Sequence, residues 1–199
     1  MNAVRLTLPD RDRDALLEVI NIGSGNALSA LSRMLSGVRL DMSVPQWLYS
    51  PNDIGARDLN GDGVLVSMDV VGPWPCGMAV AMEQQAASEL AAALLRRSVE
   101  PLMVGGEPES ALVESVNILS CSFLGAFAAL VPGVFVPRPP VVVYGKLAAL
   151  LRTQMGPNGL AIGNRFVAKN GGIAGHILWL ANADVATSVS AGLRPSVSG

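Results

Sequence analysis

Histidine, cysteine and charged residues are scarce in this chain, and each scarcity excludes a class of site. The 199 residues include one histidine and two cysteines, and only 15% are charged. Two cysteines cannot form a disulfide framework, so a reducing, cytoplasmic location is expected. His176 alone leaves little room for a zinc site or a catalytic triad, and we interpret it as a plain strand residue.

Several partners and locations are also disfavoured by what the sequence lacks. The net charge is −2 and no Lys/Arg cluster with interleaved aromatics occurs, so no nucleic-acid partner is expected. The first residues lack the apolar run of a signal peptide. An uncharged stretch, 118–136, is interrupted by Pro132-Gly133 and has Glu114 and Asn117 at its leading edge. It predicts a buried helix, a turn and a strand rather than membrane insertion.

What the sequence does contain is one short motif, present twice. Asp14, Glu18 and Asn21 form D-x-x-x-E-x-x-N, and S-x-x-x-E-x-x-N follows with Ser110, Glu114 and Asn117. Each position of the second copy lies 96 residues after its counterpart (114 minus 18). Pro45 and Pro140 follow the two copies with an offset of 95. Conserving a fold does not require the same Glu and Asn twice, so the repetition predicts two equivalent working sites.

Hydrophobic periodicity and turn residues predict the same order of elements in both halves. Long helices are expected over 10–35 and 109–131, with shorter helices over 84–97 and 183–193, the last capped by Asn182 or Asp184. Strands are expected over 38–44, 64–71, 77–83, 141–146, 161–169 and 173–181, with loops over 51–63 and after 146. Asn170-Gly171-Gly172 is typical of a hairpin turn.

This order predicts an α/β (α+β) fold with a pseudo-twofold internal repeat. Hairpin-linked strands favour a largely antiparallel sheet of about six strands, covered by helices that include the two long site-bearing helices. We expect residues 1–199 to form a single domain built from repeats at about 10–97 and 109–194. The hydropathy permits self-association, but the sequence does not establish an oligomeric state.

The repeated motif places a carboxylate beside a carboxamide on one helix face. Positions i, i+4 and i+7 share a face, and Glu18 and Asn21 are separated by about 4.5 Å along the axis. A carboxylate can bind a lysine or arginine, and a carboxamide can both donate to and accept from one water. Such a pair suits phosphoryl transfer to water, which depends on positioning and electrostatics. A single E-x-x-N is usually a solvated Glu and a locally bonded Asn; the duplication favours function.

These residues resemble the motif of the CheC-type phosphatases of bacterial chemotaxis. The segment E-V-I-N-I-G-S-G-N-A from Glu18 looks like the family's first site, and E-S-V-N-I-L-S from Glu114 looks like its second. Two intact copies resemble CheC more than CheX, whose subunit carries fewer sites. FliM shares the fold but lacks the paired Glu and Asn, and FliY has an added C-terminal domain that this chain is expected to lack. Pro45 departs from the pattern by one residue in its spacing.

The resemblance implies hydrolysis of the aspartyl phosphate of a CheY-like response regulator. Glu18 or Glu114 would bind the regulator's lysine, and Asn21 or Asn117 would orient the attacking water. The regulator would bring the Mg²⁺, so no cofactor or metal ligand is expected in this chain. Supporting roles fall to Asp14 and Ser110, which shape the helix face, and to Pro45 and Pro140, which hold the neighbouring loops. A CheD-like deamidase is a further expected partner.

Other interpretations remain open. A non-catalytic module that docks a receiver domain or a CheD-like deamidase, or a flagellar-switch scaffold, would use the same helix faces. Asp58, Asn60, Asp62 and Gly63 match the start of a calcium loop, although a turn before a hairpin is preferred. The glycines of 23–25 indicate close helix packing rather than a phosphate loop. Preferred as core residues are Cys121, Trp74 and Trp179.

Overall fold

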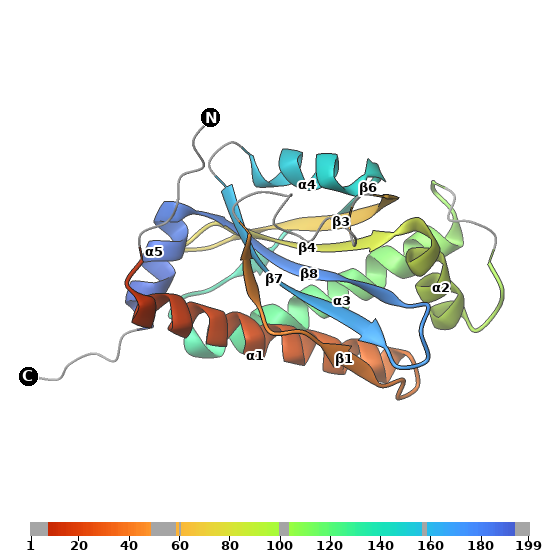
Figure 1. Cartoon of the computed structure of the whole chain (residues 1–199), viewed down its shortest axis with the longest axis horizontal. Coiled ribbons are helices and arrows are strands. Elements are labelled where there is room, and N and C mark those ends of the chain that lie inside the picture. Colours follow the sequence, from red (N-terminus) through yellow and green to blue (C-terminus); the bar gives the residue numbers. More distant parts are fainter. Residues whose placement is uncertain (1–7, 49–58, 60, 100–103, 157–158, 194–199) are drawn as a thin grey trace, which may run out of the picture.

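Two layers of helices enclose one antiparallel sheet in the computed structural model of the chain (Figure 1). The structure describes residues 8–48, 59, 61–99, 104–156 and 159–193. Within them are two long helices, α1 (Asp10–Met34) and α3 (Glu107–Leu130). Shorter helices are α2 (Gln84–Leu95), α4 (Leu147–Met155) and α5 (Ala183–Gly192). Figure 1 shows α1 and α3 side by side beneath the sheet and α4 on its other face.

The sheet has the order β1-β7-β8-β4-β3-β5, with β2 also pairing β7 and β6 also pairing β3. All of the pairings in the described residues are antiparallel, as predicted. The four inner strands are β3 (Asp62–Val71), β4 (Cys76–Glu83), β7 (Gly159–Ala168) and β8 (Ala174–Asn182). The edges consist of the short strands β1 (Leu40–Met42), β2 (Gln46–Leu48), β5 (Val136–Pro137) and β6 (Val141–Lys146).

The sheet order makes the internal repeat visible. β4 and β8 pair at the centre, β3 and β7 flank them, and each edge is a broken strand that follows a long helix. The two halves therefore contribute equivalent elements to one continuous sheet, which confirms the predicted fold class. The exact repeat boundaries at about 10–97 and 109–194 remain a prediction.

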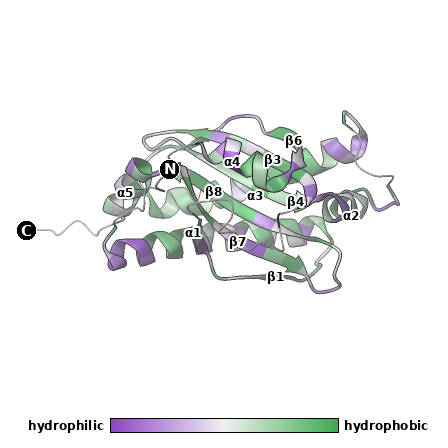
Figure 2. Ribbon diagram, turned by 45° about the horizontal axis from the view of Figure 1, so that its top comes forward, coloured by the Kyte–Doolittle hydropathy of each residue, from purple (hydrophilic) through white to green (hydrophobic). Residues whose placement is uncertain are grey.

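The hydrophobic core has two parts, one on each face of the sheet. The larger lies between the sheet and α1, α2, α3 and α5, and it contains Trp179, Phe123 and Phe127, all fully buried. The Phe127 ring lies 5.9 Å from Phe123 and 6.1 Å from Trp179, between centroids. The smaller part lies under α4 around Leu147 and Leu151. Figure 2 shows apolar and polar residues alternating along the ribbons of the long helices, and the apolar ones that are buried face the sheet.

α3 crosses α1 closely, and the crossing depends on one glycine. A Cβ at Gly23 would lie 2.6 Å from the Phe123 ring, so only glycine allows the helix backbones to approach this far. The helices run in opposite directions in Figure 1. A Cβ added at Gly25, two residues later on α1, would meet nothing within 4 Å. Close helix packing was thus predicted correctly for Gly23 and wrongly for Gly25.

Among the described helices, α3 is the one whose length and composition would allow it to cross a membrane. Its packing indicates a core helix instead. α3 lies along α1 and α2, and its Leu112, Phe123 and Phe127 are completely buried. It also carries Glu107, Glu109 and Glu114. We interpret α3 as a core helix rather than a membrane span, as the sequence predicted.

The structure corrects the sequence prediction at the sheet edges and after residue 146. The predicted strand 38–44 is only three residues long, Leu40–Met42, and a second short strand follows Pro45, because proline cannot donate to the ladder. The predicted loop after 146 is the helix α4, whose Leu147 and Leu151 form a buried i, i+4 pair. At α5, Asn182 is the N-cap and accepts from Val185 N–H at 2.8 Å. Most of the predicted loop 51–63 lies outside the described residues.

Candidate functional site

The two motif copies lie on the outer faces of α1 and α3 with matching exposure. Glu18 and Glu114 are exposed, and Asn21 and Asn117 are half-buried one turn later. The residues on the opposite side of each helix face inward. Leu16, Val19 and Ile20 in α1 are buried, as are their counterparts Leu112, Ser115 and Val116 in α3. The structure therefore brings each predicted Glu and Asn together on an accessible helix face.

The Glu and Asn side chains keep most of their hydrogen-bonding capacity. Within the described part of the chain, Glu18, Asn21 and Glu114 form no side-chain hydrogen bond or ion pair, and Asn117 Oδ1 only accepts from Cys121 Sγ at 4.0 Å. A rigid helix thus presents a carboxylate and a carboxamide that are available to a visiting molecule. This arrangement can bind a cation with the carboxylate and hold a water with the amide.

An exposed isoleucine adjoins each pair. Ile22 is 37% exposed and Ile118 is 39% exposed, immediately after Asn21 and Asn117 in the chain. Each isoleucine lies one helical turn from its glutamate, on the same side of the helix. An apolar side chain beside a polar pair is typical of a surface that excludes water when a protein partner docks.

The supporting residues occupy similar places in the two halves. Asp14 and Ser110 are exposed one turn before the glutamates, and Ser110 Oγ donates to the Gly106 carbonyl at 3.2 Å. Pro45 and Pro140 are half-buried between the two pieces of the edge strands, β1–β2 and β5–β6. The one-residue difference in spacing leaves both prolines at the break of an edge strand.

Different contacts anchor the site-bearing helices to the sheet edges. At α3, Tyr144 Oη of β6 donates to Glu109 Oε2 at 2.5 Å, and the Gly105 N–H donates to Glu109 Oε1 at 3.1 Å. At α1, the Arg13 guanidinium lies 5.6 Å from the ring centroid of Trp47 in β2. Both contacts fix the helix less than two turns before its glutamate. None of these four side chains was singled out from the sequence, because their partners lie 34 or more residues away.

The Tyr144–Glu109 contact predicts a pH-dependent contribution to stability. Burial, the hydrogen bond to Glu109 and the charge of that carboxylate raise the pKa of Tyr144 above its ordinary value. A raised folded-state pKa stabilises the protein fully below the unfolded pKa of about 10, and the contribution is lost as pH rises above it. We expect Tyr144→Phe to lower the free energy of unfolding by about 0.5–1.5 kcal/mol at pH 7. Its stability should also decline less steeply above pH 10.

Urea unfolding of both proteins between pH 7 and pH 11 tests this expectation. Parallel stability curves over that range would contradict the assigned role of Tyr144.

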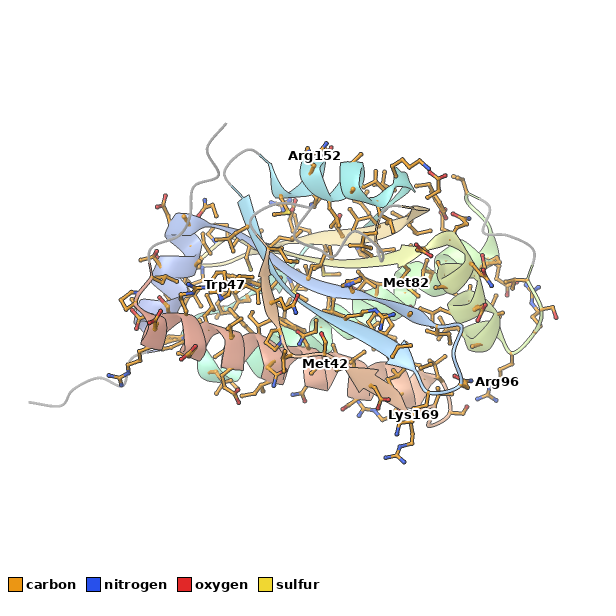
Figure 3. All side chains as sticks on the ribbon, in the orientation of Figure 1. Met42, Trp47, Met82, Arg96, Arg152 and Lys169 are labelled. Carbon is orange, nitrogen blue, oxygen red and sulfur yellow. The ribbon has the colours of Figure 1, made fainter. Side chains whose placement is uncertain are left out.

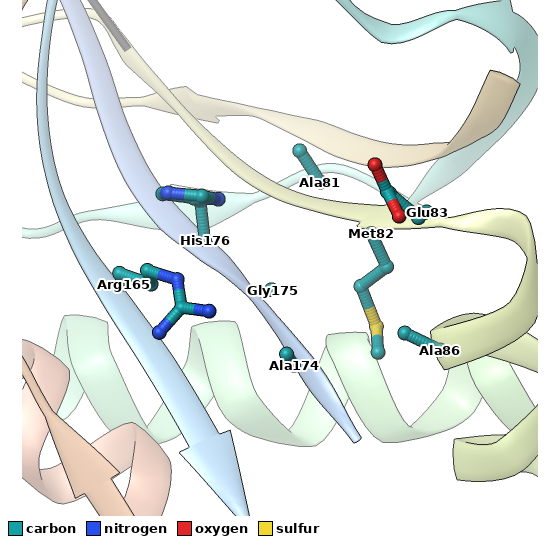
Figure 4. Close-up of a pocket in the computed structure, with 8 residues that line it drawn as sticks. All are labelled: Ala81, Met82, Glu83, Ala86, Arg165, Ala174, Gly175 and His176. Carbon is teal, nitrogen blue, oxygen red and sulfur yellow. The ribbon is translucent and has the colours of Figure 1, made fainter. Parts of the chain in front are cut away.

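Two other candidates from the sequence, the calcium-loop match and His176, involve no residue of these helix faces. Asp58 and Asn60 of the calcium-loop match lie outside the described residues, and Asp62 pairs with Lys146 Nζ at 2.9 Å. His176 lies in β8 beside Arg165 of β7, where a cavity of only about 100 Å³ opens (Figure 4). Neither place contains a residue of the repeated motif.

Two of the residues predicted to be in the core are placed as expected and one is not. Trp179 is fully buried, and Trp74 packs at the edge of the core with its ring 6.2 Å from Phe135. Cys121 is exposed, which corrects the prediction of a buried side chain. Position 121 lies on the outer stripe of α3, one turn after Asn117, so it cannot face the sheet.

No group of three or more His, Cys, Asp or Glu side chains in the described residues is arranged to hold a metal ion. The expectation of a partner-borne Mg²⁺ remains a prediction.

Comparison with known proteins finds relatives of the fold and a family model that matches the first copy of the motif. The model of the CheC-like family matches residues 12–49, which contain Asp14, Glu18, Asn21 and Pro45. Comparison with curated proteins finds no match. The family match and the structural neighbours together confirm the resemblance to CheC-type proteins.

Solved structures share this fold over nearly the whole chain. FliY of Thermotoga maritima is 16% identical, with a TM-score of 0.73 and coverage of 94% of this chain and 98% of that one. A CheC-like superfamily protein from Shewanella sp. PV-4 is 18% identical, with a TM-score of 0.61 over 82% and 97% of the chains. CheX in the CheX–CheY–BeF₃–Mg²⁺ complex of Borrelia burgdorferi is 18% identical, with a TM-score of 0.52 over 89% and 98%.

Proposed function

We propose that this chain is a phosphatase that hydrolyses the aspartyl phosphate of a CheY-like response regulator and so terminates a chemotaxis or motility signal. The observation that carries the proposal is the pair of Glu–Asn couples, each with an exposed glutamate and a half-buried asparagine, at equivalent places on two antiparallel helices. The fold shared with CheX, which is solved in complex with CheY, BeF₃ and Mg²⁺, supports a regulator as the partner. Beryllium trifluoride is a chemical mimic of a phosphoryl group.

Each side chain of a couple has a distinct role in this proposal. The glutamate, Glu18 or Glu114, binds a lysine of the regulator and thereby fixes the docking geometry. The amide of Asn21 or Asn117 accepts from and donates to the attacking water, which it holds in line with the phosphorus–oxygen bond that breaks. Both side chains project from rigid helices, and positioning of this kind supplies much of the catalysis of phosphoryl transfer.

The chain supplies no cofactor in this proposal, because the Mg²⁺ that neutralises the phosphoryl oxygens is carried by the regulator. The reaction places the protein in the cytoplasm, where response regulators act. A CheD-like deamidase as a second partner has no support in the described contacts and remains an expectation from the resemblance.

Substitutions that inactivate one couple at a time test the proposal. The first-site protein keeps only the first site intact and carries Glu114→Gln and Asn117→Ala. The second-site protein keeps only the second site intact and carries Glu18→Gln and Asn21→Ala. Decay of phosphorylated regulator is measured with a small amount of each protein, so that repeated turnover is visible. We expect partial activity from each of these and none above the regulator's own decay when all four residues are substituted. Unchanged decay with the unsubstituted protein would refute the phosphatase.

A second candidate function has a specific observation in its favour. FliY of Thermotoga maritima gives a TM-score of 0.73 over 94% of this chain, so the fold also fits a binding module or a switch component that docks a receiver domain without hydrolysing its phosphate. Saturable binding of the regulator together with unchanged phosphate decay would favour this candidate.

The exposed Cys121 makes the two sites chemically distinguishable. It lies 4.0 Å from Asn117 Oδ1, whereas α1 has Gly25 at the equivalent position. Burial raises the pKa of the other thiol, Cys76, to about 11, so that thiol is protonated and unreactive near neutral pH. We expect N-ethylmaleimide to abolish the activity of the second-site protein and to leave the first-site protein unchanged, measured by phosphate release.

The control for this labelling is Cys121→Ser in the second-site protein, which should stay active in the presence of the reagent. Equal inhibition of both single-site proteins would show that the reagent acts elsewhere.

A further inference from the structure

A groove continues the first site along α1. Glu18 and Asn21 share one stripe of the helix with Gly25, Ser29 and Ser32, because their spacings of three, four and seven residues return to the same side. Gly25, Ser29 and Ser32 form one wall of a groove of about 420 Å³. The absence of a side chain at Gly25 leaves the groove open toward Asn21, about 6 Å away along the axis.

The other wall of the groove consists of β1 and the residue before it, and it contains charged side chains. Arg39 and Asp41 line it on either side of Leu40. Asp41 is within 3.9 Å of Lys169 Nζ, so its charge is partly offset. The Arg39 side chain is exposed and makes no ion pair within the described part of the chain. Figure 3 shows Lys169 and Arg96 gathered at this end of the molecule. The groove next to the first site is therefore positively charged, in a protein whose net charge is −2.

The second repeat carries different side chains at the same places. At the offset of 95 that relates Pro45 to Pro140, the counterpart of Arg39 is Val134 and that of Asp41 is Val136. These valines are 76% and 56% exposed, whereas Phe135 takes the core-facing place of Leu40. The Phe135 ring lies 5.3 Å from Phe127 and 6.2 Å from Trp74. The surroundings of the second site are thus apolar where those of the first are polar and basic.

We propose that the α1–β1 groove is a specificity subsite of the first site, in which Arg39 binds an acidic segment of the phosphorylated response regulator. The inference rests on the proposed function, because it takes the regulator as the molecule docked at Glu18 and Asn21. A phosphorylated aspartate and its metal-binding carboxylates make the docking face of such a partner acidic, which complements Arg39. The two sites then share one reaction and differ in how they bind the partner: the first through charge, the second through apolar contact.

Charge reversal at Arg39 in each single-site protein tests the proposal. Because Arg39 touches the partner's segment and not the reacting atoms, Arg39→Glu should raise KM of the first-site protein at least about fivefold with kcat nearly unchanged. It should leave the second-site protein unaffected. Raising the salt concentration from 50 to 200 mM should raise KM of the first-site protein more than that of the second. Arg39→Lys should retain most of the affinity.

Arg152→Glu is the matched control, since Arg152 is an exposed arginine on α4, across the sheet from the groove (Figure 3). An equal change from Arg152→Glu, or a change in both single-site proteins from Arg39→Glu, would overturn the subsite. Binding of a beryllofluoride-activated regulator is measured in parallel. Binding that depends on Arg39 without accelerated phosphate decay would support the subsite and refute the phosphatase function. Binding that does not depend on Arg39, together with accelerated decay, would refute the subsite and support the phosphatase function. Failure of the regulator to bind would overturn both.

Discussion

Replacing both asparagines, Asn21→Ala with Asn117→Ala, is expected to reduce accelerated dephosphorylation to the regulator's own decay rate. The two amides are half-buried on rigid helices, one turn from the exposed glutamates to which the proposed function assigns partner binding. Losing the group that positions the attacking water costs on the order of 10²-fold or more, because the water then occupies many unproductive orientations. The assay is decay of phosphorylated regulator under repeated turnover.

The same variant should still bind the regulator, because Glu18 and Glu114 remain in place. Asn26→Ala is the matched control: Asn26 is an exposed asparagine of α1 whose Nδ2 donates to the Ile22 carbonyl at 2.9 Å, so it is already engaged. We expect that control to keep the activity of the unsubstituted protein. Unimpaired turnover in the double asparagine variant would refute the assignment of these amides.

Replacing Gly23 by alanine is expected to produce the largest loss of stability of the changes considered. The new Cβ would lie 2.6 Å from Cε2 of Phe123, a fully buried ring that stacks on Phe127 with centroids 5.9 Å apart. The ring cannot move away freely, so α1 and α3 must separate at an overpacking cost of about 1–3 kcal/mol. The gain of about 0.5–1 kcal/mol from replacing a helical glycine offsets part of it.

Gly25→Ala provides the matched comparison on the same helix. Its Cβ would meet nothing within 4 Å, so only the gain in helix propensity remains, and stability should rise by about 0.5–1 kcal/mol. Urea denaturation of the two variants measures the difference. Equal stability of the two would show that the helix crossing tolerates a side chain at position 23. Separation of the helices in the first variant should also lower turnover at both sites, because each couple is placed by that crossing.

The regular elements could be read from the sequence because each has a local cause. The inner strands are largely apolar runs bounded by turn residues, and they appear within two residues of their predicted limits. α4 was missed because it is nine residues long and lies directly after a strand, where its Leu147–Leu151 spacing is too short to show a period. The edge strands were misjudged because their length depends on pairing with β7 and β3 on either side of a proline.

Residues that act in long-range pairs could not be foreseen. Asn164 is fully buried in β7, and its Nδ2 donates to the Ser43 carbonyl at 2.9 Å, holding the break between β1 and β2 beside Pro45. Tyr144 reaches Glu109 in a different element. Neither pair has a spacing that identifies it, because the contacts exist only after the edge strands dock on the sheet.

The sequence by itself determined the two Glu–Asn couples and the face they share, since a helix of 3.6 residues per turn aligns positions 18 and 21, or 114 and 117, whatever surrounds it. Only the tertiary structure decided that these faces are exposed, that Cys121 adjoins one motif copy, that a groove containing Arg39 extends from the other, and that the two copies lie on crossing antiparallel helices. Burial of one helix face against the sheet fixes which face remains in solvent, and that choice depends on contacts between residues far apart in the chain.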